Sequence, residues 1–181
     1  MKGIVFTEFL EMVEENYGYE VVDTIIENST LQSKGIYTSV GTYDFKEMVS
    51  LITSLSKEIN VEIQKLIYTF GLYFFHSLTK SYPKIFTYYK TAFGLLSGIE
   101  NHIHVHVRKI YPDAELPYFI VHTEEEKKLV LEYQSERAMY HFALGLMEQT
   151  LKHFNEEANI EFQLLNKEGT KVMFTLTKDA K

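Results

Sequence analysis

Three histidines alternate with apolar residues in the run His102-Ile103-His104-Val105-His106. In a β-strand, the three imidazoles would share one face and could bind a metal ion together. In a helix, His102 and His106 lie one turn apart, while His104 projects roughly 200° away from them. Apolar residues recur at helical spacing on both sides of the run, which favours the helix and turns His104 toward the interior.

A buried His104 has two interpretations. It is either a core histidine that hydrogen-bonds to a backbone carbonyl, or an axial ligand to haem iron, for which a neutral imidazole is suited. His102 and His106 are expected to face solvent, and a metal-binding pair at that spacing is the alternative.

A second group of polar side chains occurs in Tyr133-Gln134-Ser135-Glu136-Arg137, where a strand is expected to pass into a helix. The two hydroxyls and the guanidinium could converge on one or two carboxylates, which arginine binds through two parallel hydrogen bonds. The alternative is that Ser135 caps the helix and Arg137 is a surface charge.

The front half of the chain shows apolar residues three to four positions apart, which predicts helices. Asn60 is expected to cap the N-terminus of one of them. Pro83 suits the first turn of a long helix that would end near Tyr111 and would carry His104. The expected helices span about residues 5–18, 20–27, 45–59, 61–78 and 83–110.

Beyond Pro117 the apolar period approaches two, which is typical of strands. Two hairpins are expected, over 118–133 and 160–176, and a helix over about 136–154 separates them. The fold class is therefore α+β, with an N-terminal helical subdomain packed on a C-terminal subdomain of one helix and a four-stranded antiparallel sheet. Residues 1–181 are expected to form one domain, with a ligand crevice between the two parts.

Composition excludes several classes of function. The formal charge of −7, without a basic patch, argues against nucleic acid and anionic membranes as partners. The absence of cysteine excludes disulfides, a thiol nucleophile and thiolate metal sites. No apolar run reaches the length of about 18 residues that a membrane span needs, and Met1-Lys2-Gly3 leads directly into an amphipathic pattern, so a cytoplasmic protein is expected.

Several motifs occur in the order and spacing of the haem nitric oxide/oxygen binding (H-NOX) family. They are the opening Met1-Lys2-Gly3, Tyr17-Gly18 after the first helix, the segment from His104 to Tyr111, and Tyr133-x-Ser135-x-Arg137. The chain thus resembles a bacterial, stand-alone H-NOX domain over about residues 1–178.

The resemblance implies a haem b cofactor whose iron is ligated by His104. It also implies that the haem propionates are held by Tyr133, Ser135 and Arg137, and that the porphyrin is distorted by contact with Val5 and Pro117. The family is a family of sensors, so no enzyme activity is expected.

The resemblance also bears on which gas is bound. The distal positions that carry polar groups in oxygen-binding relatives are here Phe9, Phe74 and Phe142. Phenylalanine cannot donate the hydrogen bond that stabilises bound dioxygen, so nitric oxide, and carbon monoxide as a second ligand, are the expected gases. Tyr73 and Tyr140 lie close in sequence but are displaced around their helices, and an oxygen-binding pocket would require one of them.

The expected mechanism is that nitric oxide weakens the bond between iron and His104. A haem held distorted by Val5 and Pro117 can then relax, and the helix bearing His104 can shift. The resemblance implies a separate signalling partner, either a sensor histidine kinase or a cyclic-di-GMP enzyme.

Three other functions stay open at the level of sequence. One is a dioxygen sensor, and another is a porphyrin carrier without a gas response. The third is a metal-dependent enzyme that uses His102, His104 and His106, for which Glu100 is the only nearby carboxylate base.

Overall fold

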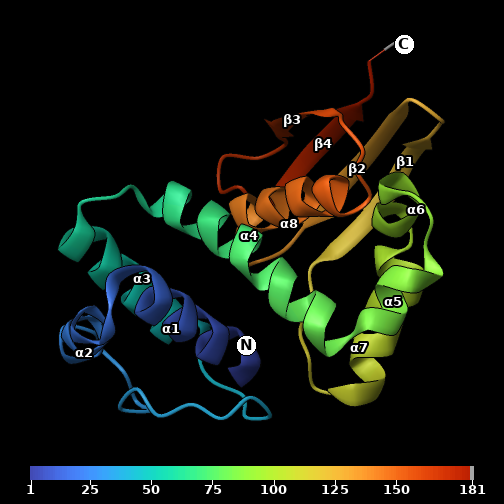
Figure 1. Cartoon of the computed structure of the whole chain (residues 1–181). Helices are drawn as coiled ribbons and strands as arrows, with labels where there is room; N and C mark the ends of the chain where they lie inside the picture. Colours follow the sequence, from blue (N-terminus) through green and yellow to red (C-terminus); the bar gives the residue numbers. More distant parts are fainter. Residues whose placement is uncertain (180–181) are drawn as a thin grey trace.

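The computed structural model describes residues 1–179, and its front half is helical (Figure 1). Gly18, with a φ of 86°, separates the first two helices, and the Asp44 side chain caps the third by accepting a hydrogen bond from the Lys46 amide. The four helices are α1 (Gly3–Tyr17), α2 (Tyr19–Glu27), α3 (Phe45–Ile59) and α4 (Ile63–Ser81).

The prediction that Asn60 begins a helix is wrong. Asn60 instead ends α3 in the left-handed conformation, with a φ of 53°, and its amide donates to the Ser56 carbonyl. Asparagine tolerates this conformation, so the same residue type serves at either end of a helix. The next helix starts three residues later, at Ile63.

The prediction of one long helix over residues 83–110 is also wrong, because the segment is divided into four short helical pieces. Pro83 does occupy the first turn, but Tyr89 is extended and Thr91 caps a new helix by accepting from the Gly94 amide at 3.1 Å. The pieces are α5 (Pro83–Tyr88), α6 (Ala92–Ser97), the π-helical turn η1 (Ile99–His104) and α7 (Val105–Ile110).

The second half contains the expected four-stranded antiparallel sheet, in the order β1-β2-β4-β3. Buried residues alternate along β2 and β4, so that Leu131 opposes Phe174 and Tyr133 opposes Val172 on the covered face. The α+β fold class is therefore confirmed. The elements are β1 (Tyr118–Glu124), β2 (Lys128–Gln134), α8 (Tyr140–His153), β3 (Asn159–Leu164) and β4 (Lys171–Thr177).

Two hydrophobic cores meet along the contact between α4 and α8. One core is formed by helices α1, α2, α3 and α4, and the other is formed mainly by the sheet, α6 and α8. At the contact, a Cβ on Gly145 would lie 2.4 Å from the Tyr68 carbonyl oxygen and 3.0 Å from the Gly71 Cα. The two helix backbones are therefore in direct contact, and only glycine fits at Gly71 and Gly145 without moving them. Figure 1 shows α4 running from the helical part to α8.

Within residues 1–179, no helix is both long enough and apolar enough to span a membrane.

Candidate functional site

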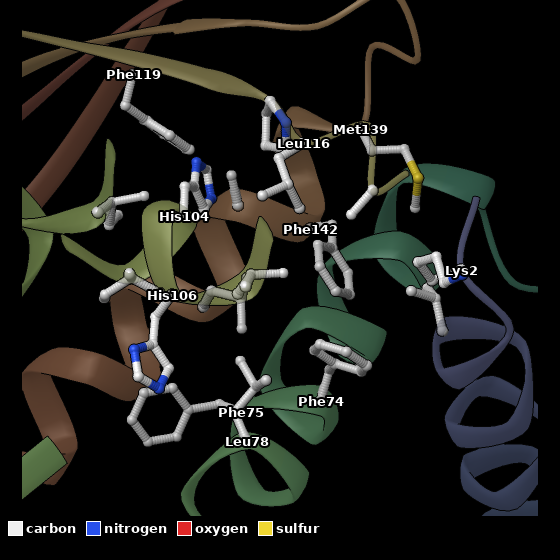
Figure 2. Close-up of a pocket in the computed structure, with 18 of the residues that line it drawn as sticks. Lys2, Phe74, Phe75, Leu78, His104, His106, Leu116, Phe119, Met139 and Phe142 are labelled. Carbon is white, nitrogen blue, oxygen red and sulfur yellow. The ribbon is translucent and has the colours of Figure 1, made fainter. Parts of the chain in front are cut away.

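A cavity of about 300 Å³ lies between the two parts of the molecule (Figure 2). Its walls come from the start of α1, from α4 and α8, from η1 and α7, and from the loop before β1. Most of the side chains that line it are apolar, and Figure 2 shows His104 on one side and Phe74 and Phe142 on another. An enclosed apolar space with few polar groups is the usual form of a small-molecule or cofactor site.

His104 is buried, with 8% of its surface exposed, and it lies at the end of the π-helical turn η1. Its Nδ1 is 3.0 Å from Oε2 of Glu100, and Oε1 of Glu100 accepts a hydrogen bond of 2.9 Å from Arg108. The three side chains therefore form a chain of hydrogen bonds, of which only His104 lines the cavity.

Electrostatics fix the protonation state of this group. Burial lowers the pKa of His104 below its ordinary value of 6.5, although the Glu100 carboxylate acts in the opposite direction. Burial alone would raise the pKa of Glu100, but the hydrogen bonds from His104 and Arg108 outweigh it and hold the pKa below 4.5. At neutral pH an ionised carboxylate only accepts, so the neutral imidazole carries its proton on Nδ1 and keeps the lone pair on Nε2. That lone pair is what a metal ligand requires.

The neighbouring histidines are placed differently from one another. Nδ1 of His102 is 2.7 Å from the Tyr89 hydroxyl, so His102 is half-buried and partnered rather than solvated as expected. His106 is exposed and borders the cavity below His104 (Figure 2). Among residues 1–179, no three histidine or carboxylate side chains are grouped as metal ligands.

Tyr133, Ser135 and Arg137 lie together at the edge of the cavity. Tyr133 is buried at the end of β2, and burial raises its pKa while a hydrogen bond with Ser135 acts in the opposite direction. The Ser135 hydroxyl accepts from the Arg137 amide, in a turn that precedes α8 by several residues, so it does not cap that helix. The Arg137 guanidinium donates to the main-chain oxygen of Glu115 at 2.7 Å and to its carboxylate. Arg137 is thus already placed to hold a carboxylate at the cavity edge.

The remaining residues named from the sequence divide into two sets. Val5, Pro117, Phe74 and Phe142 line the cavity, and the ring centroids of Phe74 and Phe142 are 5.4 Å apart. Phe9 does not line it: its ring lies in the core of the helical part, with its centroid 5.3 Å from that of Phe70, which does not line the cavity either.

Neither of the tyrosines that could have supplied a distal hydroxyl lines the cavity. Tyr73 faces the acidic side of α1, where burial and the carboxylates of Glu11 and Glu15 raise its pKa. Tyr140 packs on His141 and on Phe162 of β3.

Comparison with known proteins gives this cavity its context. The haem-NO-binding family model matches residues 2–162. The chain belongs to the haem-NO-binding, or H-NOX, family. The solved H-NOX protein from K. algicida in the Fe(II) unliganded state is 49% identical, with 100% of this chain and 98% of that chain covered and a TM-score of 0.96.

Two further H-NOX structures have the same fold. The protein from Shewanella woodyi, bound to IWP-051 in the Fe(II)CO state, is 39% identical, covers 99% of this chain and 95% of its own, and has a TM-score of 0.85. The S. oneidensis protein in the Fe(II)NO state is 23% identical, with 99% of this chain and 100% of that chain covered, and it shares the fold with a TM-score of 0.87. H-NOX domains are haem-based gas sensors rather than enzymes.

The H-NOX cavity also includes polar residues that sequence reasoning missed. Tyr82 and Tyr111 line it, and burial together with a hydrogen bond between them raises the pKa of Tyr82. Glu100 does not line the cavity but supports His104, and its spacing of four residues from His104 and eight from Arg108 is the signal in the sequence that could have revealed the hydrogen-bonded chain. Lys2 lines the cavity as well, and its Nζ is 3.1 Å from a carboxylate oxygen of Asp113.

Proposed function

We propose that residues 1–181 act as one sensor unit that binds haem b in the cavity and responds to nitric oxide. The observation that carries the proposal is His104, a buried neutral imidazole beside an apolar cavity whose Nε2 keeps its lone pair. The cavity residues fit the group: apolar walls suit the porphyrin, and Arg137 is already paired with a carboxylate. His104 would hold the iron, and Tyr133, Ser135 and Arg137 would hold the propionates.

When bound, ferrous haem would supply an iron atom that takes a diatomic gas. On the part of the cavity wall away from His104, Phe74 and Phe142 supply apolar surface and no hydrogen-bond donor. Bound dioxygen carries negative charge on its outer atom and depends on a donor, whereas bound nitric oxide is less polarised. These walls therefore favour nitric oxide, and the Fe(II)CO state of the S. woodyi relative supports carbon monoxide as a second ligand.

The substitution Phe142→Tyr tests this selectivity by adding a hydroxyl to the apolar wall. A hydrogen bond to a charged acceptor contributes about 1.5–3 kcal/mol, so the variant should bind dioxygen roughly 10- to 100-fold more tightly than the wild type. Absorption spectra of the ferrous proteins in air measure this. Tyr140→Phe is the control and should change nothing. A stable oxygen complex in the wild type that disappears in Tyr140→Phe would overturn the selectivity argument.

We further propose how the signal leaves the site. Asp113 follows α7 by three residues and accepts hydrogen bonds from Lys2 and from Thr42, which lie at the start of α1 and in the loop before α3. A weaker hold of His104 on the iron would let η1 and α7 shift, and this contact would carry the shift to the front helices. Val5 of α1 and Pro117 of the loop before β1 both line the cavity and would hold the porphyrin distorted until then. The partner that receives the signal would be a separate histidine kinase or cyclic-di-GMP enzyme.

A further inference from the structure

Glu100 contacts the imidazole of His104 directly, and Arg108 in turn contacts Glu100. One carboxylate oxygen of Glu100 is 3.0 Å from Nδ1 of His104, and the other accepts from Arg108 at 2.9 Å. The Glu100 and His104 side chains are 13% and 10% exposed, so water competes little for the hydrogen bond between them. The Arg108 side chain is 42% exposed, so it forms the solvent-facing end of this chain of hydrogen bonds.

The π-helical turn explains how these groups come together. The Gly98 carbonyl accepts from the amides of both His102 and Ile103, which widens the turn that contains Glu100 and His104. With Arg108 on one oxygen, the carboxylate cannot rotate away without breaking an ion pair. The ring of His104 is therefore held with its Nδ1 toward Glu100.

A carboxylate that accepts the N–H of a metal-bound histidine does two things at metal sites. It fixes the orientation of the ring, and it makes the ligating nitrogen more basic, so that the metal bond is stronger. We propose that Glu100, held by Arg108, is a positioning residue that orients His104 and strengthens its bond to haem iron, and so sets how readily nitric oxide breaks that bond. This inference rests on the proposed haem site.

The test uses the haem-loaded ferrous protein without a gas ligand, in which resonance Raman spectroscopy gives the iron–imidazole stretching frequency. Glu100→Leu should lower the frequency because the imidazole loses its acceptor. Glu100→Gln keeps an acceptor without the charge and should give a smaller decrease, as should Arg108→Gln. Asn101→Leu is the matched control: Asn101 lies exposed on the same turn, and its loss should leave the frequency unchanged.

A second measurement tests how the strength of the iron–His104 bond affects nitric oxide binding. With nitric oxide added, the ratio of five- to six-coordinate iron should rise roughly tenfold in Glu100→Leu, the lower end of the effect that outer partners have at metal sites.

The outcomes separate this inference from the proposed function. If the wild type lacks an iron–imidazole band, the haem site itself is wrong. If the band is present but unchanged in Glu100→Gln and Arg108→Gln, which preserve side-chain size more closely than leucine does, the positioning role is overturned while the haem site stands. A graded decrease across the variants, with Asn101→Leu unchanged, supports the role.

Discussion

Substitution of Gly145 by alanine should force α4 and α8 apart where their backbones touch. The added Cβ would lie 2.4 Å from the Tyr68 carbonyl oxygen, and ordinary van der Waals contact needs 3.4 Å, so the helices must separate by about 1 Å. Overpacking of this kind costs about 1–3 kcal/mol, and rigid backbone obstruction favours the upper end. Alanine returns about 1 kcal/mol through helix propensity, which leaves a net loss of about 2 kcal/mol in the free energy of unfolding.

Thermal unfolding followed by circular dichroism measures this loss. For a chain of this length, it corresponds to a decrease in Tm of about 4–8 °C. Gly94→Ala in α6 is the control, because its Cβ would meet side chains and no backbone atom: Thr91 Oγ1 at 2.9 Å and Tyr89 Cδ1 at 3.8 Å. A Tm for Gly145→Ala equal to or above that of the wild type would refute the backbone contact.

Two pH-dependent effects follow from the ion and hydrogen-bond contacts. Hydrogen bonds from Thr42 and Lys2 hold the pKa of Asp113 below 3.8. The carboxylate therefore stabilises the native state at pH values above its unfolded pKa, and this stabilisation is lost as the pH falls through the folded pKa. The higher Tm of the wild type relative to Asp113→Asn should therefore disappear in acid. Burial and a hydrogen bond to Glu148 raise the pKa of Tyr68 from 10.0 to about 12, so its contribution is complete below pH 10 and is lost as pH rises toward 12. Tyr68→Phe should therefore lose less stability than the wild type across that alkaline range.

Each of these effects has a clear contrary result. Tyr19 is 64% exposed, and Tyr19→Phe should follow the wild-type alkaline curve; if it flattens the curve as Tyr68→Phe does, the effect is not local to Tyr68. If the difference between the wild type and Asp113→Asn persists in strong acid, the carboxylate is not its source.

The sequence predicted the type of most elements because their apolar patterns are strongly periodic. The prediction of one long helix over residues 83–110 is wrong, because the apolar stripe that includes Phe93, Leu96 and Ile103 continues across the ends of several short helices. The stripe persists because α5, α6 and η1 pack on one core, so burial alone does not reveal where the backbone turns. The breaks depend on Thr91 and Gly98, which are local signals that the periodicity obscured.

At the candidate site, the sequence identified residues with distinctive chemistry, such as His104. It did not identify features that depend on tertiary packing or on loop conformation. The inward position of His104 was predicted from its neighbours. The position of Phe9 away from the cavity could not be predicted, because helical periodicity shows that its ring is buried but not whether the ring reaches the cavity or packs on a core residue such as Phe70. The contact between Arg137 and Glu115 depends on a loop conformation that has no periodic signal.

The proposed function requires that His104 holds haem iron in a cavity that discriminates against dioxygen. Both properties can be measured in absorption spectra of the haem-loaded ferrous protein, recorded under argon, in air and with nitric oxide. The wild type and His106→Ala should show five-coordinate iron, no oxygen complex and a shift with nitric oxide, whereas His104→Ala should lose the iron–imidazole bond. A His104→Ala spectrum identical to that of the wild type, or a stable oxygen complex in the wild type, would contradict the account.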